Sequence, residues 1–275
     1  MPEGPECTTT ACKLNEKLSG HTLLEIKVDP RFSKGVACIT INKYLPAKLQ
    51  VVSCKGKKIF FNFVEAESEF ALVSGMGMTG SWLFSQGEHT LVEMIFDEFS
   101  IYYNDPRRIG SCLVYLADRE EIDNLLATLG HDLLSQAIEY YNEGVDEVDL
   151  WLQIVPKSRR SVISNYLLSQ DDFSGIGNYL KSDILYLARI DPERKIGSLS
   201  EVDLRRLYYS GLYVIYSSYL VGGYSIKNYV HPGAEKGGYQ PLVYGRSIDD
   251  LGYEVVKLKP RKSSRSTYWV PELQR

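Results

Sequence analysis

Short hydrophobic runs separated by polar turn residues dominate the chain from about residue 22 to residue 116. Their β-branched and aromatic side chains are typical of strands. Strands of this kind, packed face to face, form a two-layer β-sandwich or a flattened barrel. The predicted strands are LLEIKV (23–28), GVACITI (35–41), KIFFNFV (58–64), FALVS (70–74), SWLF (81–84), TLVEMIF (90–96), SIYYN (100–104) and CLVYL (112–116).

Helical patterns flank this region. Residues 3–18 place Leu14 and Leu18 on one face, and Pro2 and Pro5 fall in the first turn, where proline is tolerated. Residues 117–150 are acidic and predict a short helix followed by a connection. Three helices are then expected at ISNYLLSQ (163–170), NYLKSDILYLARI (178–190) and EVDLRRLYYSGLYVIYSSYL (201–220), followed by a loop (222–240) and by strands at PLVYG (241–245), YEVVKLK (253–259) and STYWV (266–270).

Together these patterns predict an α+β protein: a β-sandwich with an N-terminal helix, then a helical domain that ends in a β-hairpin. The expected parts are an N-terminal sandwich domain (1–130), an acidic interdomain linker (131–150), a helical domain with a long loop (151–240) and a C-terminal hairpin element (241–275).

Composition and charge narrow the possibilities. The chain of 275 residues is 44% hydrophobic and 24% charged, which excludes disordered and coiled-coil classes. No apolar run is long enough for a membrane helix, and the N-terminus does not resemble a signal peptide, so an intracellular protein without membrane contact is expected. Five cysteines without a CxxC pair and four scattered histidines predict neither a disulfide framework nor a metal site.

The net charge of −4 argues at first against a polyanionic partner. However, residues 1–150 carry 13 Lys and Arg against 23 Asp and Glu, whereas residues 151–275 carry 18 against 12. The last 20 residues hold six basic side chains and one acid. The C-terminal part could therefore bind phosphates locally.

The N-terminus offers a candidate nucleophile. A small second residue normally leads to removal of Met1, which would leave Pro2 with a secondary amine. An α-amino group titrates near ~8, so a large neutral fraction exists at neutral pH. Attack on a sugar C1′ would give an iminium, a strong electron sink. Glu3 could transfer the proton, and Glu6 lies one helical turn further on; the same residues also suit an ordinary helix start.

Three further places combine phosphate-binding chemistry with turns. Lys57 follows Gly56 at a predicted hairpin turn. Gly177 and Asn178 precede a helix whose free N–H groups can bind an anion. Arg265 lies in a predicted turn between two strands, where its guanidinium could bind a phosphate in bidentate fashion. Taken singly, these could also be a solvated turn, a helix-linking loop and a basic tail.

In combination and order, the four places resemble the formamidopyrimidine-DNA glycosylase / endonuclease VIII family of base-excision repair enzymes, over essentially the whole chain. Further stretches that resemble family motifs are SGMGMTGSW (74–82), YNDPRRIG (103–110), LGHDLL (129–134) and QPLVYGR (240–246).

The resemblance implies roles residue by residue. Pro2 resembles the nucleophile, Glu3 the general acid/base, Glu6 a supporting carboxylate and Lys57 the catalytic turn lysine. Gly177 and Asn178 resemble the phosphate grip of a helix–two-turn–helix motif, and Arg265 the phosphate-binding finger arginine. Met78, Arg107 and Ile109 match the side chains that fill the space left by the flipped base, although the family pattern has Phe at the position of Ile109.

One departure concerns the family's zinc finger. The positions of its two CxxC pairs hold Ile248, Leu251, Val270 and Leu273. This resembles the zincless finger of eukaryotic and large-virus endonuclease VIII-like enzymes, with aliphatic burial expected to replace the zinc ion.

The implied function is a bifunctional DNA glycosylase/AP lyase that removes oxidised bases, with oxidised pyrimidines and hydantoins expected, and that cleaves the abasic site by β,δ-elimination. No cofactor is expected, the partner is damaged DNA, duplex or single-stranded, and a monomer is expected. The location would be the nucleus or, for a viral protein, the site of viral replication. The alternatives are a non-catalytic damaged-DNA-binding relative and a β-rich small-molecule hydrolase or carbohydrate-binding protein.

Overall fold

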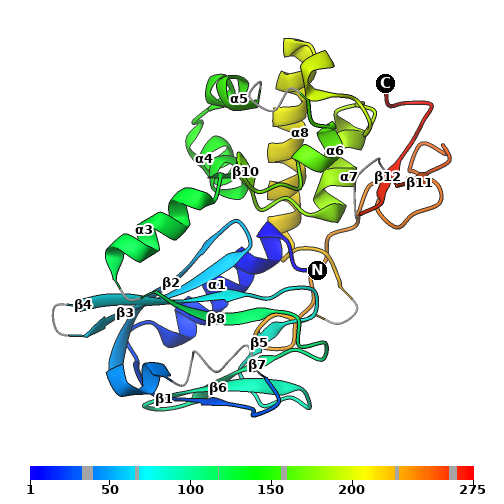
Figure 1. Cartoon of the computed structure of the whole chain (residues 1–275). Coiled ribbons are helices and arrows are strands. Elements are labelled where there is room, and N and C mark those ends of the chain that lie inside the picture. The colour runs from blue at the N-terminus through cyan, green and yellow to red at the C-terminus, as the bar shows by residue number, and fades with distance from the viewer. Residues whose placement is uncertain (33–39, 66–67, 117, 156–159, 227–228, 260–264) are drawn as a thin grey trace. The chain divides into compact units, whose positions relative to one another are not determined.

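The computed structural model describes residues 1–32, 40–65, 68–116, 118–155, 160–226, 229–259 and 265–275 (Figure 1). The chain divides into two compact units. The first comprises Met1–Thr128 and Ser225–Gly237, and the second Leu129–Tyr224 and Gly238–Arg275. In the described part of the chain, no helix is long and apolar enough to cross a membrane.

The first unit is built on one eight-stranded sheet with the order β5-β7-β6-β1-β2-β3-β4-β8, in which every neighbouring pair is antiparallel. Seven of its strands match predicted runs. The strands are β1 (Thr22–Val28), β2 (Ala47–Lys55), β3 (Lys58–Glu65), β4 (Ser68–Gly75), β5 (Ser81–Leu83), β6 (Thr90–Phe96), β7 (Ser100–Asn104) and β8 (Ser111–Leu116).

The β2 strand was missed by the sequence patterns. Its sequence AKLQVVSCK contains four polar residues, and a register shift between Leu49 and Val51 breaks the alternation of buried and exposed positions. The predicted strand GVACITI lies almost wholly outside the described residues, and its last residues begin a 3-10 helix, η2 (Thr40–Tyr44).

The sheet folds back on itself, so that its two halves form the two layers of a sandwich. The clearest evidence is the contact of Phe61 on β3 with Trp82 on β5, because four strands lie between β3 and β5 in the strand order and the ring centroids are nevertheless 5.1 Å apart. The Trp82 indole N–H donates to the hydroxyl of Ser74 on β4 at 3.0 Å. Both aromatic side chains are fully buried.

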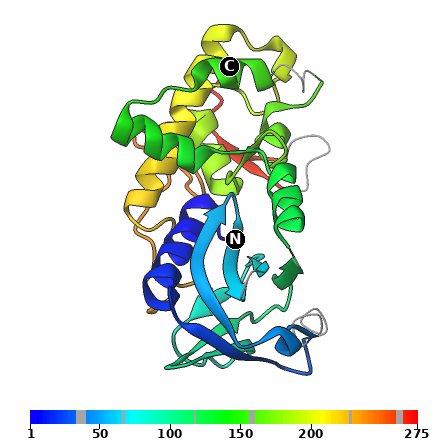
Figure 2. The same ribbon diagram turned by 90° about the vertical axis from the view of Figure 1, so that its left-hand side faces the viewer.

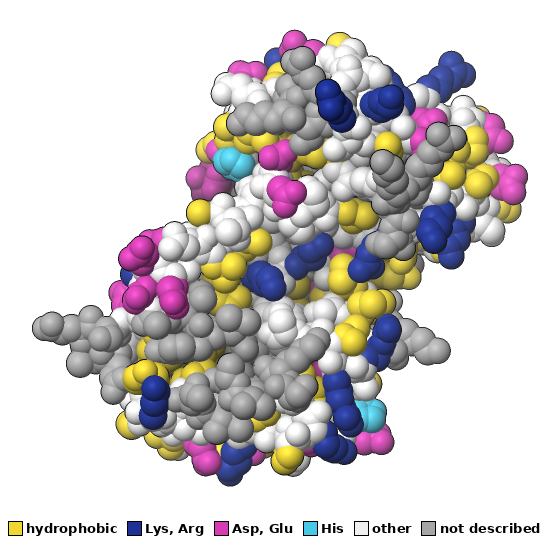
Figure 3. All heavy atoms as spheres, viewed as in Figure 1, with side chains coloured by type: hydrophobic (Ala, Val, Ile, Leu, Met, Phe, Trp, Pro, Cys, Tyr) yellow, Lys and Arg dark blue, Asp and Glu magenta, His cyan; other side chains and the backbone are white. Residues whose placement is uncertain are grey.

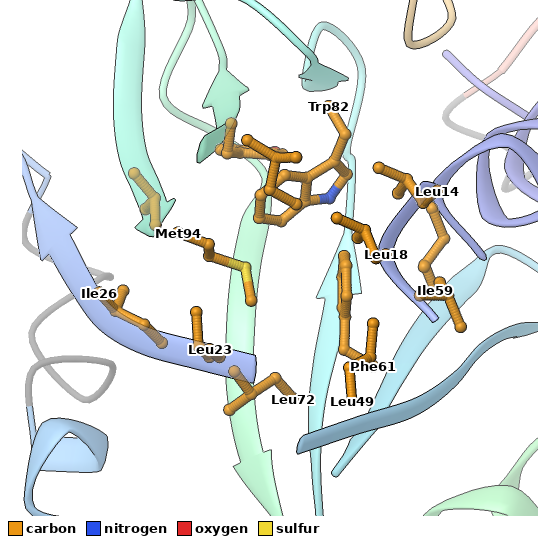
Figure 4. Packing of buried hydrophobic residues seen from close by; sticks show 14 of the residues in the cluster. Leu14, Leu18, Leu23, Ile26, Leu49, Ile59, Phe61, Leu72, Trp82 and Met94 are labelled. Carbon is orange, nitrogen blue, oxygen red and sulfur yellow. The ribbon is translucent and has the colours of Figure 1, made fainter. Parts of the chain in front are cut away.

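Helix α1 (Gly4–Leu18) runs alongside β2 (Figure 2). Leu14 and Leu18 have no exposed surface and point into the same core as Trp82 and Phe61 (Figure 4). The predicted N-terminal helix is therefore confirmed, and its apolar face fixes it on the sandwich. A further helix of this unit, α3 (Arg119–Thr128), carries acidic side chains that gather on the face shown in Figure 3.

Residues 229–235 pack on α1, although the sequence analysis assigned them to the helical domain. The Tyr229 hydroxyl lies 2.5 Å from that of Thr10 and donates to the Glu6 carbonyl at 3.1 Å. His231 Nδ1 lies 3.1 Å from the Tyr229 hydroxyl. The four residues of this cluster are all buried: Glu6, Thr10, Tyr229 and His231. Glu235 adds an ion pair to Lys13.

The second unit is mainly helical. The 20-residue α8 spans the predicted range. By contrast, α6 is shorter than predicted: it ends at Tyr166, and residues 167–169 form a turn. PLVYG forms no strand, but the predicted C-terminal hairpin is present as β11 and β12. The elements are α4 (Leu133–Glu143), α5 (Val148–Ile154), α6 (Ile163–Tyr166), α7 (Asn178–Leu187), η4 (Ile196–Ser198), α8 (Glu201–Leu220), the short parallel pair β9 (His131–Asp132) and β10 (Phe173–Ser174), and β11 (Val256–Leu258) with β12 (Thr267–Trp269).

The segment expected as a linker, 131–150, is instead part of this unit's core. Asp132 caps α4 by accepting from the backbone N–H groups of Leu134 and Ser135. Leu133, Leu134 and Ala137 are buried, and α4 packs against α8. The many acidic residues of this segment make its narrow apolar face difficult to recognise in the sequence.

We predict that Phe61→Ala lowers the free energy of unfolding of the first unit by about 3–5 kcal/mol, because it leaves a cavity between the two layers. Urea denaturation followed by tryptophan fluorescence would measure this. Phe84→Ala is the control, since Phe84 is 36% exposed; an equal loss in both variants would contradict the assignment of Phe61 to the inter-layer core.

Candidate active site

The first turn of α1 holds two buried carboxylates. Glu3 and Glu6 are 2% and 0% exposed. The Glu3 backbone N–H donates to the Glu6 carboxylate at 2.6 Å, and the Glu3 side chain accepts from the backbone of Glu6, which makes a capping box. The positive end of the helix dipole favours negative charge at this position. The first turn of α1 therefore fixes both carboxylates, and Glu3 directly follows Pro2 in the chain.

Pro2 and Lys57 line one pocket of about 290 Å³ in the first unit. Lys57 is placed there by the tight β2–β3 turn, in which Gly56 has a φ of +60°, a conformation that favours glycine. Met1 also lines the pocket. The structure thus brings together three of the predicted catalytic positions, since Glu3 adjoins Pro2 in the chain.

Cys7 lies in the same pocket and was not singled out from the sequence. It is 1% exposed. Burial, together with the neighbouring Cys54 and Glu6, raises the pKa of the Cys7 thiol well above its usual value, although Lys57 acts in the opposite direction. Cys7 is therefore a neutral thiol at neutral pH and a weak nucleophile.

Two adjacent loops of the first unit present the predicted void-filling residues. Met78 and Ile109 are 36% and 39% exposed, and Arg107 is exposed as well. The Arg107 guanidinium lies 3.6 Å from the Met78 sulfur. Ile109 also lines the pocket of Pro2. The structure therefore groups these three residues beside the predicted catalytic ones.

A buried carboxylate, Asp105, organises these loops and was missed by the sequence analysis. It accepts from the backbone N–H groups of Arg107, Ile109 and Gly110 at 3.1, 2.9 and 2.9 Å, and from the hydroxyl of Thr79. It has no exposed surface. In the sequence, Asp105 stands out only because it precedes a proline in a predicted turn, and that position does not indicate that its side chain is buried.

In the second unit, Gly177 caps α7 and Asn178 is its first residue. The neighbouring Lys181 is fully buried. Its ammonium donates to the Asn178 side-chain oxygen at 2.9 Å and to the Ser266 carbonyl at 3.4 Å. Because Ser266 follows Arg265 in the chain, Lys181 connects the two predicted phosphate-binding positions.

The finger is not held together as the sequence suggested. Val270 is fully buried and Leu273 packs beside it, but Ile248 and Leu251 are 56% and 61% exposed. The expected burial of all four aliphatic side chains is therefore wrong. The small apolar cluster is completed instead by Tyr186, Val243 and Val255.

Polar side chains organise the two finger turns. Asp249 accepts from the backbone N–H groups of Leu251 and Tyr253 at 2.9 and 2.8 Å, and from the Tyr186 hydroxyl at 2.9 Å. Gln274 accepts from the Val270 N–H at 2.7 Å and donates to the Ile190 carbonyl at 2.8 Å. Ile248 and Leu251 stay exposed because the hydrogen bonds of Asp249, rather than apolar packing, close their turn.

Asp183 of α7 anchors the entry to the finger. Its carboxylate accepts from the backbone N–H groups of Leu242, Val243 and Tyr244 at 2.9–3.2 Å and from the Tyr239 hydroxyl at 3.0 Å. Burial raises the pKa of Asp183 to about 6, although these hydrogen bonds act in the opposite direction.

Comparison with known proteins identifies the family. The formamidopyrimidine-DNA glycosylase N-terminal domain matches residues 1–112. A formamidopyrimidine-DNA glycosylase of Thermus thermophilus is 31% identical over 90% of this chain and 88% of its own length. The chain belongs to the formamidopyrimidine-DNA glycosylase family. A relative of the same name from Exiguobacterium sibiricum is 27% identical over 100% of this chain and 99% of its own.

Solved structures of the family share the whole fold, which confirms the predicted α+β architecture. The MutM (Fpg) protein of Thermus thermophilus aligns with a TM-score of 0.84 and 26% identity, over 99% of this chain and 98% of that one. Fpg of Lactococcus lactis, in a complex with DNA that contains an abasic site, aligns with a TM-score of 0.83 and 25% identity, over 99% of both chains. These family members are bacterial and do not distinguish the zincless endonuclease VIII-like branch.

We predict that Asp105→Asn destabilises the first unit by about 2–4 kcal/mol, because an amide cannot accept all the hydrogen bonds that the carboxylate accepts. Chemical denaturation would measure the loss. Glu98→Gln, which removes the same charge at an exposed position, should change the free energy of unfolding by less than about 0.5 kcal/mol. Equal values for the two variants would contradict the role of Asp105.

Asp183 should make the stability of the second unit depend on pH. Its folded pKa, about 6, lies above the value of an unfolded aspartate, about 3.9. Its contribution is therefore complete below pH ~4 and is lost as the pH rises through ~6, by at most about 3 kcal/mol. Urea denaturation at a series of pH values should show this component in the native chain and not in Asp183→Asn.

Asp203 should affect the pH dependence of stability in the opposite direction from Asp183. Burial raises the pKa of the Asp203 carboxyl, but hydrogen bonds from Ser200 and the charge of Arg194 outweigh burial and lower it. Its contribution is present above the unfolded pKa and is lost as the pH falls. An identical pH dependence of stability in the native chain and Asp183→Asn would contradict the assignment.

Proposed function

We propose that this member of a DNA glycosylase family is a bifunctional glycosylase/AP lyase that excises oxidised bases through an N-terminal proline. The observation that carries the proposal is the pocket shared by Pro2 and Lys57, with Glu3 buried beside Pro2. A secondary amine, a primary amine and a carboxylate in one small site are the groups that imine chemistry at a sugar carbon requires.

The proposed reaction begins once Met1 has been removed, which frees the Pro2 nitrogen. Pro2 attacks C1′ of the damaged nucleotide while Glu3 supplies a proton to the sugar or base, so that the base leaves with the bonding electrons. The resulting iminium acidifies the C2′ protons. Loss of one of these protons expels the 3′ phosphate by β-elimination, and δ-elimination then releases the 5′ phosphate.

The remaining predicted residues would hold the substrate. Extrusion of a base from a duplex costs a few kcal/mol, which protein contacts must offset. Met78 and Arg107, with Ile109 beside them, would occupy the vacated stack in the manner of wedge residues. Asn178 and Arg265, with Lys57, would hold the DNA backbone. The Arg107–Met78 contact and the Lys181 link between Asn178 and the hairpin support these assignments.

The finer proposals concern substrate and branch. We propose the endonuclease VIII-like branch, with oxidised pyrimidines and hydantoins as substrates and a finger that binds no zinc. Residues 241–275 contain neither cysteine nor histidine, so the usual zinc ligands are missing from the finger sequence. The structured turns of Asp249 and Gln274 support a finger that folds through hydrogen bonds. A monomer acting at the nuclear or viral site of DNA replication completes the proposal.

The alternative, a non-catalytic DNA-binding protein, would need only the DNA-binding residues and does not account for the pocket that Pro2 and Lys57 share.

We predict that borohydride traps a covalent adduct between the Met1-free protein and DNA containing an abasic site, and that peptide mass spectrometry locates it at Pro2. The control carries one glycine inserted before Pro2, which keeps the Pro2 nitrogen acylated and should abolish the adduct at that residue. Failure of the Met1-free protein to form an adduct would overturn the proposed mechanism.

A further inference from the structure

The pocket of Pro2 and Lys57 contains a second lysine, Lys58, which none of the roles above uses. Lys58 is the first residue of β3 and is half-buried. Gly75 at the end of β4 and Ser111 at the start of β8 line the same pocket and pair with each other across the sheet. Three neighbouring strands thus contribute to this side of the pocket.

The bare backbone of Gly75 leaves space that Lys58 and Ser111 share. A Cβ atom placed on Gly75 would lie 3.1 Å from the Lys58 ammonium nitrogen and 2.5 Å from the Ser111 hydroxyl oxygen. The ammonium and the hydroxyl therefore reach toward the same point. Together they offer two hydrogen-bond donors on one wall of a site that already contains Lys57.

Among the described residues, no carboxylate forms an ion pair with the Lys58 ammonium, and no carbonyl accepts a hydrogen bond from it. These residues therefore leave the charge of Lys58 without a counter-charge. By contrast, Lys55, which pairs with Lys58 across the same turn, donates to the Leu126 carbonyl at 2.9 Å. A half-buried cation in a pocket favours an anionic ligand, because partial desolvation strengthens the attraction.

We propose that Lys58 and Ser111 form an anion subsite that binds a DNA phosphate adjacent to the nucleotide held at Pro2. The inference rests on the proposed function, since that function makes a polyanionic backbone the ligand of this pocket. Lysine ammonium and serine hydroxyl groups are common donors to phosphate oxygens. Lys58 is accordingly a substrate-binding residue, distinct from Lys57, and Gly75 is required because a side chain there would occupy the position of the phosphate.

The test compares Lys58→Gln with Lys48→Gln, which removes the same charge from an exposed position on neighbouring β2. Binding of duplex DNA with an uncleavable abasic-site analogue is measured over a range of salt concentrations. Lys58→Gln should weaken binding and reduce the slope of log K against log salt by about one, whereas Lys48→Gln should leave the slope unchanged. Lys58→Arg should restore the slope, and Gly75→Ala should behave like Lys58→Gln.

Single-turnover borohydride trapping at saturating DNA separates binding from chemistry. The proposal expects adduct formation by Lys58→Gln within about twofold of the native rate, because saturation removes a binding defect. An unchanged salt slope in Lys58→Gln, or a trapping rate at saturating DNA that falls well beyond twofold, would overturn the subsite. If the native protein forms no adduct, the proposed function fails, and the salt slope still reports on Lys58.

Discussion

The attachment of Pro2 to the first turn of α1 is the constraint on which the pocket of the first unit depends. Pro2 directly precedes Glu3, the N-cap residue of α1, so the position of Pro2 follows that of the helix. Two features fix that helix. The capping box of Glu3 and Glu6 defines its first turn, and Leu14 and Leu18 hold its far end in the core of the sandwich. The precision of the pocket therefore originates in packing that lies several turns away from Pro2.

Buried polar side chains hold the loops in both units in the same manner. Asp105 fixes the loop of Arg107 and Ile109, Asp183 fixes the entry to the finger, and Asp249 fixes one finger turn. In each case a carboxylate accepts several backbone N–H groups of an irregular segment, which satisfies donors that no regular structure could pair. Irregular loops thereby gain a defined geometry, and exposed residues such as Met78 can be presented rigidly.

Much of this arrangement could be predicted from the sequence. The strands with clear alternation, the N-terminal helix and α8 follow from periodicity, and the combination of four motifs indicates the family. The strand β2 was missed because a register shift interrupts its alternation. The helix α4 was missed because acidic residues mask its apolar face. In both cases tertiary contacts, rather than local preference, determine the structure.

Prediction of the candidate active site from the sequence has the same limit: residues that act through tertiary contacts are not recognised. Pro2, Glu3 and Lys57 could be chosen because their chemistry is distinctive, whereas Asp105 and Lys58 look like ordinary turn and strand residues until burial and neighbours are known. The expected burial of Ile248 and Leu251 failed for a related reason. Hydrophobic character alone does not show whether a turn is closed by apolar contacts or by the hydrogen bonds of an adjacent Asp249.

The neutral thiol of Cys7 has a consequence for the conditions in which such an enzyme works. Oxidants that damage bases in DNA also attack cysteines, and they do so through the thiolate. Cys7 lines the same pocket as Pro2, yet its burial and the neighbouring groups keep it protonated. The thiol of Cys7 is therefore less prone to oxidation than a thiolate would be at the same place in the pocket.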